Sequence, residues 1–199
     1  GFTPYDRGAC REKIAEADND GMFTPPSLNK HSIQYPGVAG GQNWGGLAYD
    51  PNNKLLVMPQ NYVVSYNKLV PRDQKPAADQ EFEYQGYSPN EGTPYVVKHE
   101  VLLSPFGVPC VAPPWGTLLA VSLESGEKVW EVPFGTPRDM VPGLSWFPFF
   151  PEMGFPSAGG PTVTDSGLVF IGASMDNYIR AYDVRDGRQI WRHRLPAGG

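Results

Sequence analysis

The sequence lacks several features that would assign it to other classes of protein. No apolar run reaches the roughly 18 residues that a helix needs to cross a bilayer. Lys and Arg total 16 against 21 Asp and Glu, and the basic residues form no cluster. A net charge of −5 argues against a nucleic-acid partner, which would require a basic surface. An aromatic content of 13% argues equally against a disordered chain.

Candidate catalytic and metal-binding side chains are also scarce. The three histidines, His31, His99 and His193, have no partners that would form a Ser-His-Asp arrangement, so each is predicted to be an ordinary surface or hydrogen-bonded histidine. No group of His, Asp and Glu has metal-ligand spacing. We therefore assign no catalytic residue and no metal ligand. Cys10 and Cys110 are far apart, and the residues alone leave open a disulfide or two buried thiols.

Turn-forming residues, in contrast, are abundant. The chain of 199 residues contains 23 Gly and 22 Pro, which is typical of a turn-rich all-β protein. One helix is predicted over residues 6–19, where Asp6 can cap the start and Cys10, Ile14 and Ala17 share a face. We interpret it as a surface helix packed on the flank of a β-domain.

The strongest pattern in the sequence is a hairpin that occurs twice. Residues 178–191 contain a β-prone run, an Asp-Gly turn signal at 186–187 and a second extended run ending at Trp191. Residues 120–130 repeat this order of residue types and end at Trp130. The likeness favours repeated blades of a β-propeller over two unrelated hairpins. At about 40–60 residues per blade, the chain would hold roughly three to four blades, which suggests part of a longer protein.

Two stretches interrupt the strand pattern of this single domain. Residues 70–94 are polar, and their acidic side chains are predicted to form a solvated surface excursion. Residues 136–156 are rich in Pro and aromatic residues, which preclude a helix. The aromatic residues of 141–156 either pack against the domain or offer a contact surface. We describe both stretches as loop insertions in a domain that covers 1–199.

The glycine-rich segment 37–46 is the most suggestive place for a ligand. Five glycines surround the sequence Gln-Asn-Trp at 42–44, and they let the backbone approach another group closely. The spacing does not match a phosphate-binding loop. Asn43 and Trp44 together offer an amide beside a flat aromatic ring, which suits a planar polar ligand. The alternative is a tight turn between blades in which Trp44 fills the core.

Taken together, these stretches resemble the C-terminal part of the membrane-bound quinoprotein dehydrogenases that depend on pyrroloquinoline quinone (PQQ) and act on glucose, quinate or polyols. The resemblance runs over nearly the whole chain and is weakest in 70–94. It is carried by 23–27, 35–37, 43–46, 103–110, 114–116, 159–161 and 176–183, followed by Gly187 and Trp191.

The resemblance implies a propeller of eight four-stranded blades in which the closing tryptophans, Trp130 and Trp191, are structural. It implies PQQ near the propeller axis with a divalent cation, calcium or magnesium. In this family a carboxylate base takes the proton of a sugar or polyol hydroxyl, hydride passes to the quinone, and electrons leave to ubiquinone. It also implies a protein on the periplasmic face of the inner membrane, anchored by an N-terminal segment that this chain lacks.

Only part of the family's site carries over to this chain. The matching cofactor loop is 42–44, so the Asn43 side chain and the Trp44 backbone are expected to hydrogen-bond the quinone. The family's catalytic Asp, its cofactor-contacting Lys and its main cation ligands lie N-terminal to this chain. The fragment is therefore expected to be inactive alone. Relatives have cysteines matching Cys10 and Cys110, so the resemblance favours a disulfide between them.

Four questions stay open at this point. A non-enzymatic propeller that scaffolds an assembly would share the Trp-closed blades. The aromatic residues Phe147, Phe149 and Phe150 could face the membrane or ubiquinone. The substrate could be glucose, another aldose, quinate or a polyol, and the sequence does not indicate an oligomeric state.

Overall fold

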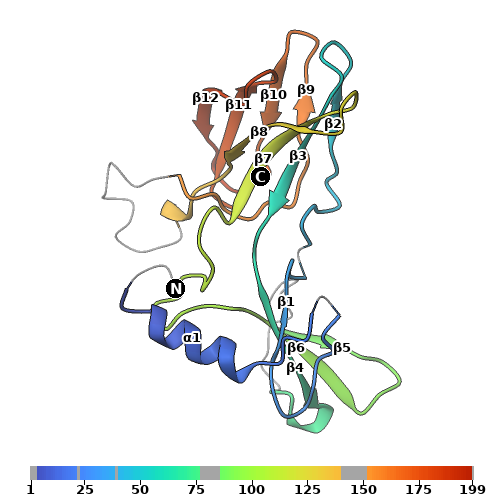
Figure 1. Cartoon of the computed structure of the whole chain (residues 1–199), viewed down its shortest axis with the longest axis vertical. Coiled ribbons are helices and arrows are strands. Elements are labelled where there is room, and N and C mark those ends of the chain that lie inside the picture. Colours follow the sequence, from blue (N-terminus) through green and yellow to red (C-terminus); the bar gives the residue numbers. More distant parts are fainter. Residues whose placement is uncertain (1–3, 22, 39, 77–85, 140–151, 199) are drawn as a thin grey trace. The chain divides into compact units, whose positions relative to one another are not determined.

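The computed structural model describes residues 4–21, 23–38, 40–76, 86–139 and 152–198, which divide into two compact units (Figure 1). Unit 1 comprises Gly1–Ala39 and Val63–Ala112, and unit 2 comprises Gly40–Tyr62 and Pro113–Gly199. The described residues form three four-stranded antiparallel sheets and one α-helix. The expected all-β chain with a single helix is therefore confirmed. None of the described helices has the length and apolar character needed to cross a membrane.

Unit 1 contains the helix and one sheet. Helix α1 spans Arg7–Glu16, and a 3-10 helix, Arg72–Gln74, follows the second strand of the sheet. The strand order is β1-β4-β6-β5, with bounds Ser32–Gln34 for β1, Ser65–Pro71 for β4, Tyr95–Val101 for β6 and Gly86–Pro89 for β5. Strand β5 lies within 70–94, the stretch predicted to be a surface excursion, and pairs with β6. Residues 77–85 of that stretch lie outside the described residues.

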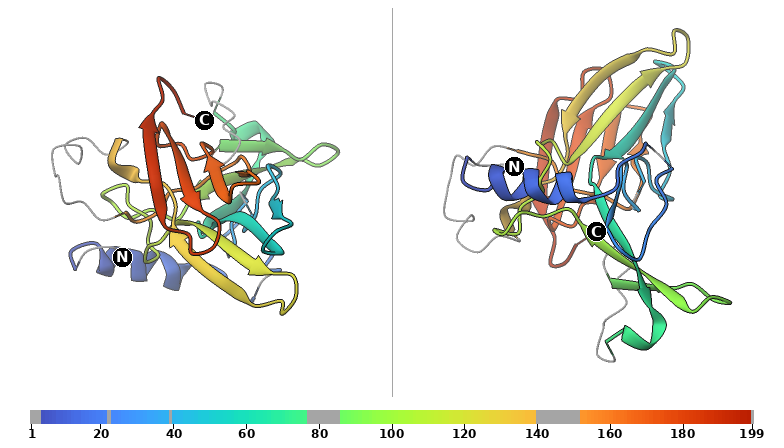
Figure 2. Two further views of the ribbon diagram at one scale, coloured as in Figure 1. Left: turned by 90° about the horizontal axis from the view of Figure 1, so that it is seen from above. Right: turned by 60° about the horizontal axis from the view of Figure 1, so that its bottom comes forward.

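Unit 2 contains two sheets that lie beside each other in both views of Figure 2. The first has the order β2-β3-β7-β8, with bounds Ala48–Asp50, Leu55–Asn61, Gly116–Ser122 and Lys128–Pro133. The second has the order β9-β10-β11-β12, with bounds Thr162–Val163, Leu168–Ile171, Tyr178–Asp183 and Gln189–Arg194. A 3-10 helix, Pro137–Asp139, follows β8. Both predicted hairpins are present, as β7–β8 and β11–β12.

Each unit has its own hydrophobic core. In unit 2, Val57 and Leu118 of the first sheet join Val169 of the second sheet and Val184 of the turn after β11, and all four side chains are fully buried. In unit 1 the buried cluster consists of Cys10, Val64, Leu102 and Cys110. The apolar side chains of the two sheets of unit 2 therefore form one shared core.

A disulfide between Cys10 and Cys110 joins α1 to the core of unit 1, which confirms the pairing that the resemblance favoured. A helix is present where it was predicted, but it ends at Glu16 rather than at 19, and two further details of it were wrong. The side chain of Asp6 makes no capping hydrogen bond, and Ile14 is 40% exposed. Cys10 is the buried residue of the helix, so the disulfide anchors an element with little apolar surface of its own.

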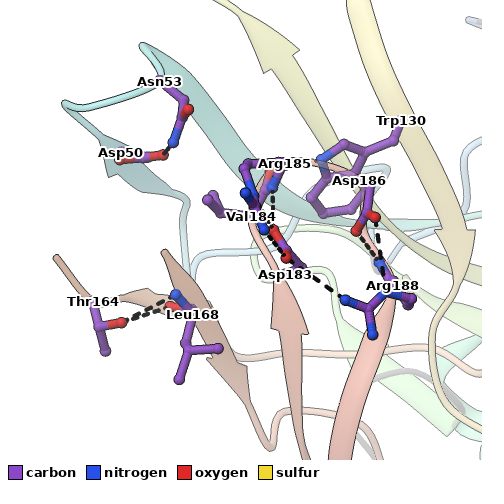
Figure 3. Close-up of polar contacts among 10 residues, drawn as sticks. All are labelled: Asp50, Asn53, Trp130, Thr164, Leu168, Asp183, Val184, Arg185, Asp186 and Arg188. Carbon is purple, nitrogen blue, oxygen red and sulfur yellow. Dashed lines mark hydrogen bonds and ion pairs between the residues drawn. The ribbon is translucent and has the colours of Figure 1, made fainter. Parts of the chain in front are cut away.

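Trp130, at the end of the first hairpin copy, holds the two sheets of unit 2 together (Figure 3). Its Nε1 donates a hydrogen bond of 2.8 Å to the carbonyl of Val184, and its ring covers Gly187. A Cβ on Gly187 would lie 2.5 Å from the ring, so the contact requires glycine. Trp130 is 8% exposed, which confirms its predicted structural role.

The turn beneath Trp130 differs from the predicted two-residue turn. Gly187 does adopt a positive φ of 70°, but it closes a four-residue loop between Asp183 and Arg188, whose backbone atoms are hydrogen-bonded. The side chain of Asp183 accepts a hydrogen bond from the backbone of Arg185 and ion-pairs with its guanidinium. These contacts lower the pKa of Asp183 well below its ordinary value. By accepting from the backbone N–H of Arg185, the Asp183 carboxylate satisfies a donor of the four-residue loop that the strand ladder does not bind.

Trp191 was predicted to be structural like Trp130, but its side chain is 47% exposed. It lies on β12, the edge strand of the second sheet, and stacks on His193 with 5.9 Å between ring centroids. Among the described strands, β12 pairs with β11 alone. Trp191 therefore occupies the same position in its hairpin as Trp130 does in the other, but it is much less buried.

Candidate functional site

The candidate site lies at one end of the sheets of unit 2. The turns after β2, β9 and β11 gather at the opposite end (Figure 3). Each strand therefore has its other end at the edge where the glycine-rich loop 40–46 enters β2. We call this the loop edge. It is formed by residues 40–46, 60–62, 115–116, 134–136, 153–160 and 172–177, which join the strand ends.

The loop at 40–46 presents its aromatic side chain outward. Trp44 is 81% exposed, so the alternative in which it fills the core is wrong. The Asn43 side-chain oxygen accepts a hydrogen bond of 2.7 Å from the Trp44 backbone N–H. The Asn43 carbonyl accepts a second bond, of 3.1 Å, from the N–H of Gly46, whose φ is +77°. These bonds fix a tight turn on which the indole is exposed.

Two glycine pairs bring the loop into direct backbone contact with a distant segment. A Cβ on Gly45 would lie 2.4 Å from the carbonyl carbon of Gly159, and one on Gly160 would lie 2.0 Å from the oxygen of Gly45. Real side chains do not tolerate such distances, so both segments need glycine here. The sequence predicted a close approach of this loop to another group, and part of that approach is to the protein's own backbone.

A buried asparagine that sequence reasoning missed supports the same contact. Asn61, at the end of β3, is 2% exposed, and its amide makes two hydrogen bonds of 2.9 Å to the backbone N–H and C=O of Ser157. Its own backbone N–H donates to the carbonyl of Gly41. A signal was present, because Asn61 occupies an inward position of the alternating strand Leu55–Asn61.

A buried ion pair lies at the same edge. Asp176 and Arg180 are each at most 1% exposed and bind each other through two hydrogen bonds, and Asp176 also accepts the Thr136 backbone N–H at 2.9 Å. Burial opposes the charged guanidinium, but the hydrogen bonds and charge of Asp176 raise the pKa of Arg180 above its ordinary value. Arg180 therefore keeps its charge although it is buried.

Glu131 is a second carboxylate whose hydrogen bonds are satisfied. Its Oε1 accepts from the Tyr62 hydroxyl at 2.7 Å and the Thr117 hydroxyl at 2.9 Å, and its Oε2 contacts Lys128. Burial raises the pKa of Glu131, but these three donors outweigh burial and lower it below the ordinary value. A carboxylate that stays ionised and fully hydrogen-bonded is a poor general base.

The histidines agree with the prediction that each is hydrogen-bonded or on the surface. His31 Nε2 lies 3.3 Å from Glu100, and His99 Nδ1 lies 2.9 Å from the Asn67 oxygen. Among the described residues, no three His, Cys, Asp or Glu side chains group as metal ligands would. The prediction that the cation ligands lie elsewhere stays a prediction. Phe147, Phe149 and Phe150 lie outside the described residues.

Comparisons with known proteins identify relatives over the full length of the chain. A family model described as "Glucose/ethanol/alcohol dehydrogenase, beta-propeller domain", named PQQ, matches residues 1–199. The chain is 38% identical to the quinoprotein glucose dehydrogenase of Escherichia coli K12 and 38% identical to the glycerol dehydrogenase large subunit of Gluconobacter thailandicus. It is 35% identical to a quinate/shikimate dehydrogenase (quinone) of Acinetobacter baylyi.

Each of these matches covers 100% of the chain but only 25–29% of the relative. The chain therefore spans about a quarter of the length of the curated relatives it matches. Among solved structures, a europium-containing methanol dehydrogenase superposes with a TM-score of 0.55 at 21% identity, over 86% of this chain and 24% of that one. At that identity the likeness concerns the fold alone.

Proposed function

Because the chain belongs to the PQQ β-propeller domain family of glucose, ethanol and alcohol dehydrogenases, we propose that it is part of a quinoprotein dehydrogenase. The enzyme would oxidise a hydroxyl group of a sugar, a polyol or a cyclic alcohol such as quinate and pass the electrons to ubiquinone. The match over residues 1–199 carries this proposal, and the range of substrates follows the names of the relatives.

The family match also establishes the architecture. The two four-stranded sheets of unit 2, in which the strands pair in chain order, are blades of a β-propeller, as predicted from the repeated hairpin. The contact of Trp130 with Val184 and Gly187 is how one blade of unit 2 is held against the next. We propose that the whole protein acts at the periplasmic face of the inner membrane, where a disulfide such as Cys10–Cys110 is stable.

The loop edge fits one side of a PQQ site. PQQ is a planar quinone with three carboxylates, and an exposed Trp44 ring on a fixed turn offers a flat apolar face to such a molecule. The Asn43 amide lies next to it and can hydrogen-bond a polar ring edge. Lys128 and Arg180 are both paired with carboxylates. We propose that residues outside this chain meet the carboxylates of PQQ.

The chain's own residues would bind and orient the cofactor rather than move protons. Bound PQQ would accept hydride from the substrate carbon. Trp44 would cover one face of the ring and exclude water from it, and Asn43 would hold its orientation. The base that takes the substrate proton, and the ligands of a calcium or magnesium ion, would come from the part of the protein outside this chain.

The proposal predicts that Trp44→Ala in the full-length protein weakens PQQ binding about two- to thirteenfold, because a stacked aromatic contact contributes about 0.5–1.5 kcal/mol. Trp44→Phe should lose less, and Asn43→Ala should also raise the dissociation constant. The measurement is equilibrium titration of cofactor-free protein with PQQ. Phe106→Ala, which removes a 67% exposed aromatic of unit 1, is the matched control.

Wild-type PQQ affinity in both Trp44→Ala and Asn43→Ala would remove this loop from the cofactor site. Complete absence of PQQ binding by the wild-type protein would instead favour the non-enzymatic scaffold. The isolated chain of 199 residues should show no dehydrogenase activity with added PQQ and calcium.

A further inference from the structure

One face of the unit 1 sheet carries a row of cationic and polar side chains that the proposed function does not use. The antiparallel register places Lys68 of β4 directly opposite Lys98 of β6, and Lys98 directly opposite Tyr87 of β5. His31 immediately precedes β1, which pairs with β4, and so continues the row beyond Lys68. Side chains directly opposite on neighbouring strands are about 4.5–5.5 Å apart at Cβ, and like charges at this spacing repel each other.

The positive charge of this row is only partly compensated. Glu100 contacts Lys98 at 3.0 Å and His31 at 3.3 Å. Lys68 forms no ion pair within the part of the chain that the structure describes. Burial, together with the charges of Lys68 and Lys98, lowers the pKa of His31 although Glu100 opposes this, so the histidine is neutral at pH 7. One positive charge is left over.

The row forms the floor of a hollow of about 300 Å³. Its polar lining is His31, Lys68, Gln74, Tyr87 and Lys98, and its apolar lining includes Leu28 and Val70. The imidazole is held in place, because its ring stacks on Tyr66 with 4.0 Å between centroids. The volume is at the lower end of the range of small-molecule sites, about 300–1,000 Å³.

We propose that this hollow binds a small organic carboxylate. The carboxylate group would lie between the ammonium groups of Lys68 and Lys98, where it converts their repulsion into attraction. The carbon skeleton would contact Leu28 and Val70. The apolar side chains of Leu28 and Val70 lie beside the two lysines. They favour an organic acid over a strongly hydrated inorganic anion, because they cannot replace the water molecules that such an anion would lose on binding.

Binding of 4-fluorobenzoate to the full-length, cofactor-free protein, followed by fluorine NMR, tests the proposal without reference to dehydrogenase activity. Lys68→Gln should raise the dissociation constant at least fivefold. Lys30→Gln should leave it unchanged, because Lys30 belongs to the same unit but pairs with Asp18 outside the hollow. Lys68→Arg keeps the charge and should retain binding, which keeps the test valid if Lys68→Gln does not fold.

Two ligand controls define the chemistry. Neutral 4-fluorobenzamide should bind at least fivefold more weakly than 4-fluorobenzoate, and inorganic phosphate at matched ionic strength should not displace 4-fluorobenzoate at equal concentration. Equal affinity of wild type and Lys68→Gln would overturn the site. If phosphate displaced 4-fluorobenzoate as effectively as unlabelled benzoate does, the assignment to an organic acid would be overturned.

Discussion

At the scale of single residues, the loop edge depends on contacts for which only one type of side chain fits. Gly45 and Gly160 permit two backbones to touch, and Asn61 supplies both a donor and an acceptor to the backbone of Ser157. A buried amide that matches a backbone N–H and C=O acts like an additional pair of ladder hydrogen bonds. The position of Trp44 therefore depends on residues that do not themselves face a ligand.

Asn61→Ala should lower the free energy of unfolding of unit 2 by about 2–3 kcal/mol, because it leaves two buried backbone groups of Ser157 without partners. Denaturant unfolding monitored by tryptophan fluorescence measures this. Asn52→Ala is the control, since its amide bonds to Asp165 are exposed, and should cost less than about 1 kcal/mol. Equal losses in the two variants would contradict the role assigned to Asn61.

The sequence predicted the residues at this edge unevenly, for a physical reason. Gln-Asn-Trp among glycines is a local signal, because glycine permits unusual backbone conformations and close approaches. The contacts at this edge join residues about a hundred positions apart, as with Asn61 and Ser157. No local pattern specifies which distant backbone an inward asparagine will meet. The role of Trp44 and Asn43 in binding the cofactor stays a prediction.

At the scale of elements, hairpins were easier to predict than the isolated helix and edge strand. A β-hairpin is specified by alternation, a turn glycine and a closing tryptophan, all within about 15 residues. Strand β5 carries no apolar alternation and exists because β6 pairs with it, so it was missed within 70–94. Helix α1 was found by its periodicity, but its attachment through Cys10 depends on Cys110, 100 residues away.

Replacing Cys10 and Cys110 together by serine should destabilise unit 1 by about 2–5 kcal/mol, because the crosslink closes a long loop in the unfolded chain. Hydrogen exchange resolved by peptide should show α1 losing protection first, since Cys10 is its buried residue. Peptides from β7 and β11 of unit 2 are the internal control and should keep their exchange rates. Loss of protection in those peptides to the same extent would contradict separate cores for the two units.

At the scale of the whole chain, the two units have separate cores and different titrating groups. In unit 1, burial lowers the pKa of His99, and burial with nearby lysines lowers that of His31. In unit 2, hydrogen bonds lower the pKa of Glu131 and Asp183. In the unfolded chain, the two histidines of unit 1 have a pKa of about 6.5, and the two carboxyl groups of unit 2 have a pKa of about 4.

These shifts predict that acid weakens unit 1 before unit 2. A histidine whose pKa is lowered by folding binds protons better in the unfolded state, so its contribution is complete above about pH 6.5 and is lost as the pH falls below that value. Each histidine can contribute a slope of at most about 1.4 kcal/mol per pH unit. Folding lowers the pKa of the two carboxyl groups of unit 2. They therefore stabilise the unit above about pH 4, and this contribution is lost only in stronger acid.

Hydrogen exchange at pH 7 and pH 5.5, corrected for intrinsic rates, should therefore show protection lost in β4 and β6 while β7 and β11 stay protected. His99→Asn should flatten this dependence, because an asparagine amide can donate to the Asn67 oxygen in place of Nδ1 and does not titrate. Adding His31→Asn should flatten it further. If β7 and β11 lose protection at the same pH as β4 and β6, the units unfold together in acid, and the assignment of this transition to the two histidines is wrong.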